Sequence, residues 1–98
     1  MATMLQLTKI AMRITVTAYD PEIELLINAA CSDLGIVGVT ATSETTDPLL
    51  QQAIITYVRM NFGTPEDYED LKKSYDEQKA QLISNRNYGL ADWWEGNE

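Results

Sequence analysis

Residues 47–63 read DPLLQQAIITYVRMNFG, and this stretch decides the fold. An Asp side chain accepts the unpaired N–H groups of a helix's first turn, and a following Pro fits the position that needs no N–H. A Gly past the end supplies the left-handed residue that stops a helix. The stretch therefore predicts a helix over residues 48–62. Its apolar face is the widest in the chain, so we expect it at the centre of the fold: Leu50, Ala53, Ile54, Tyr57, Val58 and Phe62.

Two further stretches begin in the same way, at Asp20-Pro21 and Thr64-Pro65. The first predicts a helix over residues 21–34 that closes on Gly35, and the second a helix from residue 65 to about residue 85 that closes loosely on Gly89. Their apolar positions are spaced three, four or seven apart: Ile23, Leu26, Ile27, Ala30 and Leu34 in one, and Tyr68, Leu71, Tyr75 and Leu82 in the other.

The N-terminal part predicts one more helix, over residues 3–13, capped by Thr3 or Thr8. Leu5, Ile10 and Met12 give it an imperfect apolar face. Residues 14–17 are β-branched but isolated, so we expect an extended connection there. The fold class is therefore all-α, a small bundle of about four helices. It has a long loop at residues 35–46 between the second and third helices and an extended C-terminal tail. We divide the chain into a helical domain at residues 1–86 and a tail at residues 87–98.

Composition excludes several kinds of function. The net charge of −8, with only seven Lys and Arg, disfavours binding to a nucleic-acid backbone. The absence of His removes the commonest general base and the commonest metal ligand. No Ser lies in a nucleophile motif, and the acids of the Asp20-Pro21 and Thr64-Pro65 turns are explained by helix capping. We therefore expect no catalytic residue, no metal and no cofactor.

Two further sequence features bear on location and reactivity. The single cysteine, Cys31, follows two alanines, which favours a packed, inert thiol over a reactive or intermolecular one. No stretch approaches the ~20 apolar residues of a membrane span, and the start lacks a signal-peptide pattern. We expect a protein of the cytosol with no membrane segment.

The segments outside the helices are the candidates for contact with partners. The tail contains large aromatic residues that a short domain can hardly bury. Together with Leu90 they suit pockets on a partner better than the chain's own helices, although folding back is the alternative: Tyr88, Trp93 and Trp94. Possible contacts between subunits or rings lie in the loop and on the fourth helix, where the tyrosines are more simply core or edge residues: Ile36, Val37, Val39, Tyr68 and Tyr75.

The order of these parts resembles a known family. A short first helix leads to an acid-led second helix and a variable loop. A third helix, reading DPLLQQAIITYV at residues 47–58, precedes a charged helix that ends in SNRNYG at residues 84–89. This order is similar to the small head–tail connector (adaptor) proteins of tailed bacteriophages, over roughly residues 5–90. The chain departs from that family at Lys9, where an acidic pair is common, and in its loop, which lacks aromatic residues.

The resemblance implies a structural protein of the virion neck, made in the host cytoplasm during assembly. It implies a ring of about twelve copies that docks under the portal protein and receives a stopper or tail-completion protein. DNA would pass through without specific binding, and the aromatic tail would reach the portal. A different class of function also fits the sequence, namely a small acidic regulatory or DNA-mimic module that binds one host or phage protein.

Overall fold

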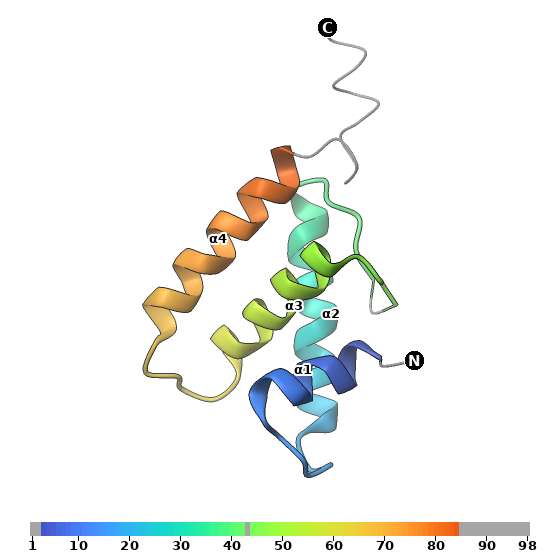
Figure 1. Ribbon diagram of the computed structural model, residues 1–98, viewed down its shortest axis with the longest axis vertical. Helices are drawn as coiled ribbons and strands as arrows, with labels where there is room; N and C mark the ends of the chain where they lie inside the picture. Colours follow the sequence, from blue (N-terminus) through green and yellow to red (C-terminus); the bar gives the residue numbers. More distant parts are fainter. Residues whose placement is uncertain (1–2, 43, 85–98) are drawn as a thin grey trace, which may run out of the picture.

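The computed structural model describes residues 3–42 and 44–84, and in these ranges the chain forms four α-helices and no strand. In chain order they are α1 (Met4–Met12), α2 (Asp20–Ile36), α3 (Pro48–Asn61) and α4 (Tyr68–Ser84). Figure 1 shows α3 between α2 and α4, with α1 across the N-terminal end of α2. The all-α bundle predicted from the sequence is confirmed.

The central place of α3 is also confirmed, since α3 packs against each of the other three helices. Leu50, Ala53, Ile54 and Val58 of its predicted face are buried, and Tyr57 and Phe62 are half-buried. Thr56 and Met60, outside the predicted face, are buried as well. The Thr56 hydroxyl donates to the Gln52 carbonyl at 2.9 Å, so its burial leaves no unpaired donor. A helix with neighbours on three sides buries more than one stripe.

Two of the helix starts are those expected. Asp47 Oδ1 accepts the Leu49 N–H at 2.9 Å and the Leu50 N–H at 3.4 Å, which caps α3. Thr3 caps α1 through a reciprocal pair, because its hydroxyl accepts the Gln6 N–H and the Gln6 side chain accepts the Thr3 N–H. Thr8, the other candidate cap, is fully buried in the middle of α1.

The apolar face predicted for α1 is wrong at Ile10, which is 71% exposed. Met4 and Thr8 are the buried residues of α1, and they stand four apart on one side of the helix. Ile10 falls on the opposite side. A short helix that contacts its neighbours along a narrow line can bury a hydroxyl and expose an aliphatic side chain.

The predicted cap at Asp20 is wrong. Asp20 is the first residue of α2, and the cap residue is Tyr19, which makes no side-chain cap bond. The Asp20 carboxylate instead forms an ion pair with Lys9 Nζ at 2.7 Å. A charged partner on α1 competes successfully with the backbone N–H groups for this carboxylate.

The predicted start of α4 at Pro65 is wrong as well. Residues 64–65 are irregular and residues 66–67 form a turn, and the Asp67 carbonyl accepts the Leu71 N–H at 2.9 Å. The helix therefore begins at Tyr68, where the apolar spacing also begins. Leu71, Tyr75 and Leu82 are buried, as the spacing predicted, whereas Tyr68, the first residue of the predicted face, is 38% exposed.

Glycine ends α3 as expected, since Gly63 has φ +66°. For α2 the assignment of Gly35 is wrong, because the helix continues through it to Ile36 and the left-handed residue is Gly38, with φ +88°. The Val39 N–H bonds the Leu34 carbonyl at 2.9 Å, and the Gly38 N–H bonds the Gly35 carbonyl at 3.0 Å. This is a Schellman motif, and the fully buried side chains of Leu34 and Val39 complete it. The loop is therefore anchored to the core at its start.

Candidate interaction surfaces

The predicted contact residues occupy three kinds of environment. Ile36, at the end of α2, is 83% exposed, and Tyr68, at the start of α4, is partly exposed. Val37 is half-buried, and Val39 and Tyr75 are buried within the subunit's own core. Among these five, Ile36 and Tyr68 therefore have the most side-chain surface to offer a partner. The four tail residues, Tyr88, Leu90, Trp93 and Trp94, lie outside the described residues.

Tyr75 anchors a polar cluster that joins α4 to α2. Its hydroxyl donates to Asp33 Oδ2 at 2.5 Å, and Lys79 Nζ reaches the same oxygen at 3.1 Å. Lys79 Nζ also lies 5.1 Å from the centre of the Tyr75 ring, and Tyr57 packs edge-on against that ring at 5.3 Å. Of Tyr68 and Tyr75, which the sequence indicated were more simply core or edge residues, Tyr75 is confirmed as a core residue.

Electrostatics in this cluster favour an ionised carboxylate beside a neutral phenol. Burial acts to raise the pKa of Asp33, but the hydrogen bonds from Tyr75 and Lys79 and the charge of Lys79 together lower it. Burial, and then the hydrogen bond to Asp33, raise the pKa of Tyr75. The charge of Asp33 is therefore turned inward and held against Lys79, away from the outer side of α2.

Two contacts tie the α1–α2 connection to the rest of the bundle. The Lys9–Asp20 ion pair joins the two helices, and Tyr19 meets Phe62 edge-to-face at 5.4 Å between ring centres. Residues 14–17 form neither helix nor strand, as predicted. These contacts fix the position of the connection relative to the end of α3.

Sequence reasoning missed an uncharged outer face on α2. Leu25 is 67% exposed and Ile36 is 83% exposed, and both stand on the side opposite the buried residues Ile23 and Leu34. We define the α2 face by four residues that follow one another along this side of the helix: Leu25, Ala29, Ser32 and Ile36. The spacing of four, three and four residues was a readable signal, but the stronger core stripe of the same helix obscured it.

A second exposed apolar patch lies around the end of α1. Ile10 is 71% exposed and Val16, in the connection that follows, is 51% exposed. Arg13 stands between them in the left-handed conformation, at φ +59°, and ends the helix. We call Ile10, Arg13 and Val16 the α1 patch.

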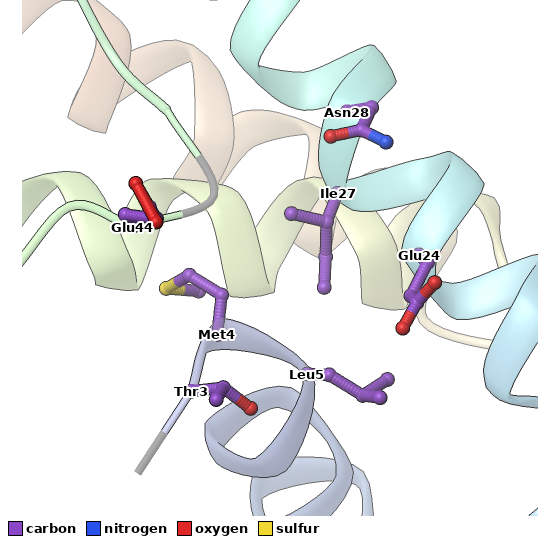
Figure 2. Close-up of a pocket in the computed structure, with 7 residues that line it drawn as sticks. All are labelled: Thr3, Met4, Leu5, Glu24, Ile27, Asn28 and Glu44. Atoms are coloured by element: carbon purple, nitrogen blue, oxygen red, sulfur yellow. The ribbon is translucent and has the colours of Figure 1, made fainter. Parts of the chain in front are cut away.

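A groove of about 430 Å³ opens between the start of α1, the middle of α2 and the end of the α2–α3 loop. Figure 2 shows Met4 and Ile27 between two carboxylates, with Glu24 on α2 at one side and Glu44 on the loop at the other. The lining offers neither a nucleophile next to a base nor a cationic group. It is an apolar depression with acids at its margins.

The described residues hold no metal-binding set, since no group of three or more Cys, Asp and Glu side chains gathers within residues 3–42 and 44–84. Cys31 is half-buried, and desolvation raises the pKa of its thiol despite a backbone hydrogen bond that acts in the opposite direction. A thiol with a raised pKa is a poor nucleophile at neutral pH.

Comparison with known families gives these surfaces a context. A family model described as phage connector protein matches residues 4–89, which include all four helices. The chain belongs to the phage connector protein family. The resemblance noted in the sequence is thereby confirmed, and the chain has the structural role of a phage connector. Neither a search of curated proteins nor a search of solved structures returned a match.

The family assignment agrees with the chemistry of the described surfaces. Connector proteins of phages are structural, and the features found here are apolar faces, ion pairs and a packed core. Within the part of the chain that the structure describes, no helix is both long and apolar enough to cross a bilayer. The match ends at residue 89, so it covers the first aromatic residue of the tail, Tyr88, and leaves Trp93 and Trp94 beyond it.

Proposed function

We propose that this connector is the subunit of a ring that lies under the portal protein in the neck of a tailed phage. The ring extends the DNA channel and joins the head to a stopper or tail-completion protein. The family match over residues 4–89 carries this proposal. A bundle with one shared core, and with side-chain caps at the starts of α1 and α3, supplies the rigid subunit that a ring needs.

The C-terminal tail is the segment that we assign to the portal. It contains Tyr88, Leu90, Trp93 and Trp94, and large aromatic side chains are favoured as anchors in partner pockets. The division into a helical domain over residues 1–86 and a tail over residues 87–98 remains our prediction. It allows docking and subunit packing to use different parts of the chain.

Charge supports passage of DNA without adhesion. The chain carries 15 acids against seven Lys and Arg. Among the described cations, Lys9, Lys72 and Lys79 are each paired with an aspartate. Phosphates would therefore meet few free cations on this subunit, and like-charge repulsion keeps DNA from binding to the wall. We expect no DNA binding at physiological salt, and a clear mobility shift there would contradict this argument.

The direct test mixes the purified protein with the portal of its own phage and examines the particles by electron microscopy. We expect an added ring on the portal, and a variant that lacks residues 87–98 to keep its helical circular dichroism but lose the ring. The double variant Trp93→Ala, Trp94→Ala should behave like the truncation, and Glu95→Gln is the matched control in the same segment. A one-to-one complex with another protein and no ring would instead favour the acidic regulatory or DNA-mimic function.

A further inference from the structure

The outer side of α2 is the longest uncharged surface on any of the four described helices that is not covered by the subunit itself. From Leu25 to Ile36 its exposed or half-exposed residues include no Asp, Glu, Lys or Arg other than Asp33, which pairs with Lys79. The two ends of this face are eleven residues apart, or about 16 Å along a helix. Its outermost side chains are aliphatic, and the residues between them, Ala29 and Ser32, are small enough to let another element approach closely.

The chain's own charge indicates what covers this face. Two copies, each with a net charge of −8, repel one another wherever acidic surfaces come close, because charges within about 8 Å are poorly screened at physiological salt. Identical subunits can therefore associate most readily through surfaces that carry no net negative charge. The α2 face meets that condition, and α4 does not, since its exposed side carries four acids against two lysines: Glu69, Asp70, Asp76, Glu77, Lys72 and Lys73.

The α1 patch complements the α2 face in both polarity and charge. Its Ile10 and Val16 are exposed aliphatic side chains, and Arg13 between them is an exposed cation. The N-terminal end of the α2 face is flanked by the exposed acids Glu22 and Glu24. None of the three ion pairs formed among the described residues uses Arg13, Glu22 or Glu24. An arginine of one copy can therefore pair with the glutamates of the next.

The two surfaces also point in different directions, as a head-to-tail contact requires. Ile10 stands on the side of α1 opposite the buried Met4 and Thr8, and the α2 face stands opposite the residues with which α2 meets α1 and α3. In Figure 1, α1 and α3 lie in front of α2. The outer side of α2 therefore faces away from the viewer, on the far side of the bundle from α1.

From these observations we propose that the α2 face of one copy packs against the α1 patch of the next copy, head to tail. The proposal rests on the proposed function, because it assigns the contact between neighbouring subunits of the ring. The occupant of the α2 face is a second copy of this chain. The outer side of α4 remains outside the contact.

The first experiment follows the intact protein alone by NMR as it is diluted from about 1 mM to about 10 μM, a range that detects millimolar association. We expect amide signals near Ile10, Val16, Leu25 and Ile36 to shift together with concentration. The proposal is overturned if no signal shifts, or if the shifts gather on α4.

The second experiment mixes variants and measures association by sedimentation. Leu25→Glu damages the α2 face, Ile10→Glu damages the α1 patch, and Ser74→Glu adds the same charge to exposed α4 as a control. Each of the first two alone should lose self-association by about tenfold or more, whereas the control should not. A mixture of the two should give dimers and nothing larger, since one intact α2 face meets one intact α1 patch. A mixture that fails to associate overturns the head-to-tail contact.

The portal assay separates this inference from the proposed function. A ring that forms equally well from Leu25→Glu would overturn the contact assigned here and leave the ring itself standing. The opposite result is that the wild-type protein self-associates through these two surfaces but forms no ring on the portal. That result would support the contact between copies and contradict the proposed function.

Discussion

Helices α2 and α4 have the same length and both pack against α3, but their outer sides differ in charge. Each has 17 residues and each packs against α3. The outer side of α2 is uncharged between Leu25 and Ile36, while the outer side of α4 carries charges along most of its length, including the exposed Lys72–Asp76 pair. The core-facing sides explain the fold equally well for both helices. Their outer sides differ because one is suited to contact with another chain and the other to water.

The largest effect should come from the core sides, where the two helices are equivalent. Leu34 of α2 and Leu82 of α4 are both fully buried. We expect Leu34→Ala and Leu82→Ala each to lower the free energy of unfolding by about 2–5 kcal/mol, as truncation of buried leucines does. Urea unfolding of the two variants measures this. A loss below about 1 kcal/mol for Leu82→Ala alone would mean that α4 packs less firmly than α2. The core-facing sides of the two helices would then not be equivalent.

A smaller effect should come from the polar cluster that joins the two helices directly. Tyr75→Phe removes the hydrogen bond to Asp33 while it keeps the ring against Tyr57. We expect a loss of about 1 kcal/mol at pH 7, less than for a fully buried charged hydrogen bond because Asp33 is partly exposed. Chemical unfolding of the variant and wild type at several pH values measures it.

The sign of the pH dependence follows from the lowered pKa of Asp33 in the folded state. The stabilisation from ionised Asp33 is fully present above the ordinary carboxyl value of 3.8 and is lost as pH falls through the lower folded value. The gap between wild type and Tyr75→Phe should therefore narrow below about pH 4. Asp33→Asn is the control, since it should remove this pH dependence from both backgrounds. If the difference in unfolding free energy between wild type and Tyr75→Phe stays constant down to pH 2, the Tyr75 hydroxyl does not act through ionised Asp33.

The sequence predicted the core-facing sides of the helices better than their outer sides. Periodicity identified most of the core residues of α2, α3 and α4, because burial repeats every three or four residues, but it missed Thr56 and Met60 of α3. It placed Ile10 in the wrong environment, because α1 is too short to average out a single misplaced side chain. Caps were predictable at Thr3 and Asp47, whose side chains accept N–H groups of the first helical turn, and not at Asp20, whose carboxylate pairs with Lys9.

The contact surfaces were less predictable for a physical reason. Ile36 was found as a loop residue, whereas the structure makes it the last residue of α2, in line with Leu25. That alignment depends on where the helix ends. The end is fixed by Gly38 and by the docking of Val39 into the core, which is a tertiary contact that no local pattern reports.

The position of the α2 end can be tested with two glycines that should respond in opposite directions. Gly35 lies inside the helix with open space around its missing side chain, so Gly35→Ala should stabilise the protein by about 0.5–1 kcal/mol. Gly38 has φ +88°, so Gly38→Ala should destabilise it by about 1 kcal/mol. Thermal unfolding of the two variants is sufficient. Destabilisation by both variants would mean that α2 ends at Gly35, and Ile36 would then leave the α2 face.

The smallest expected effect is the change in monomer stability caused by a new acid on the outer side of α2 or α4. Leu25→Glu on α2 and Ser74→Glu on α4 both place one more acid at an exposed helical position. Each should change the unfolding free energy of the monomer by no more than about 0.5 kcal/mol, because neither side chain contributes to the core. Urea unfolding at micromolar concentration measures this for the separated subunit. If Leu25→Glu then weakens association while its stability matches that of Ser74→Glu, the apolar residue at position 25 serves contact between chains. A large loss of monomer stability from Leu25→Glu would show instead that this side chain supports the subunit's own fold, and the contrast between the outer sides of α2 and α4 would need no partner to explain it.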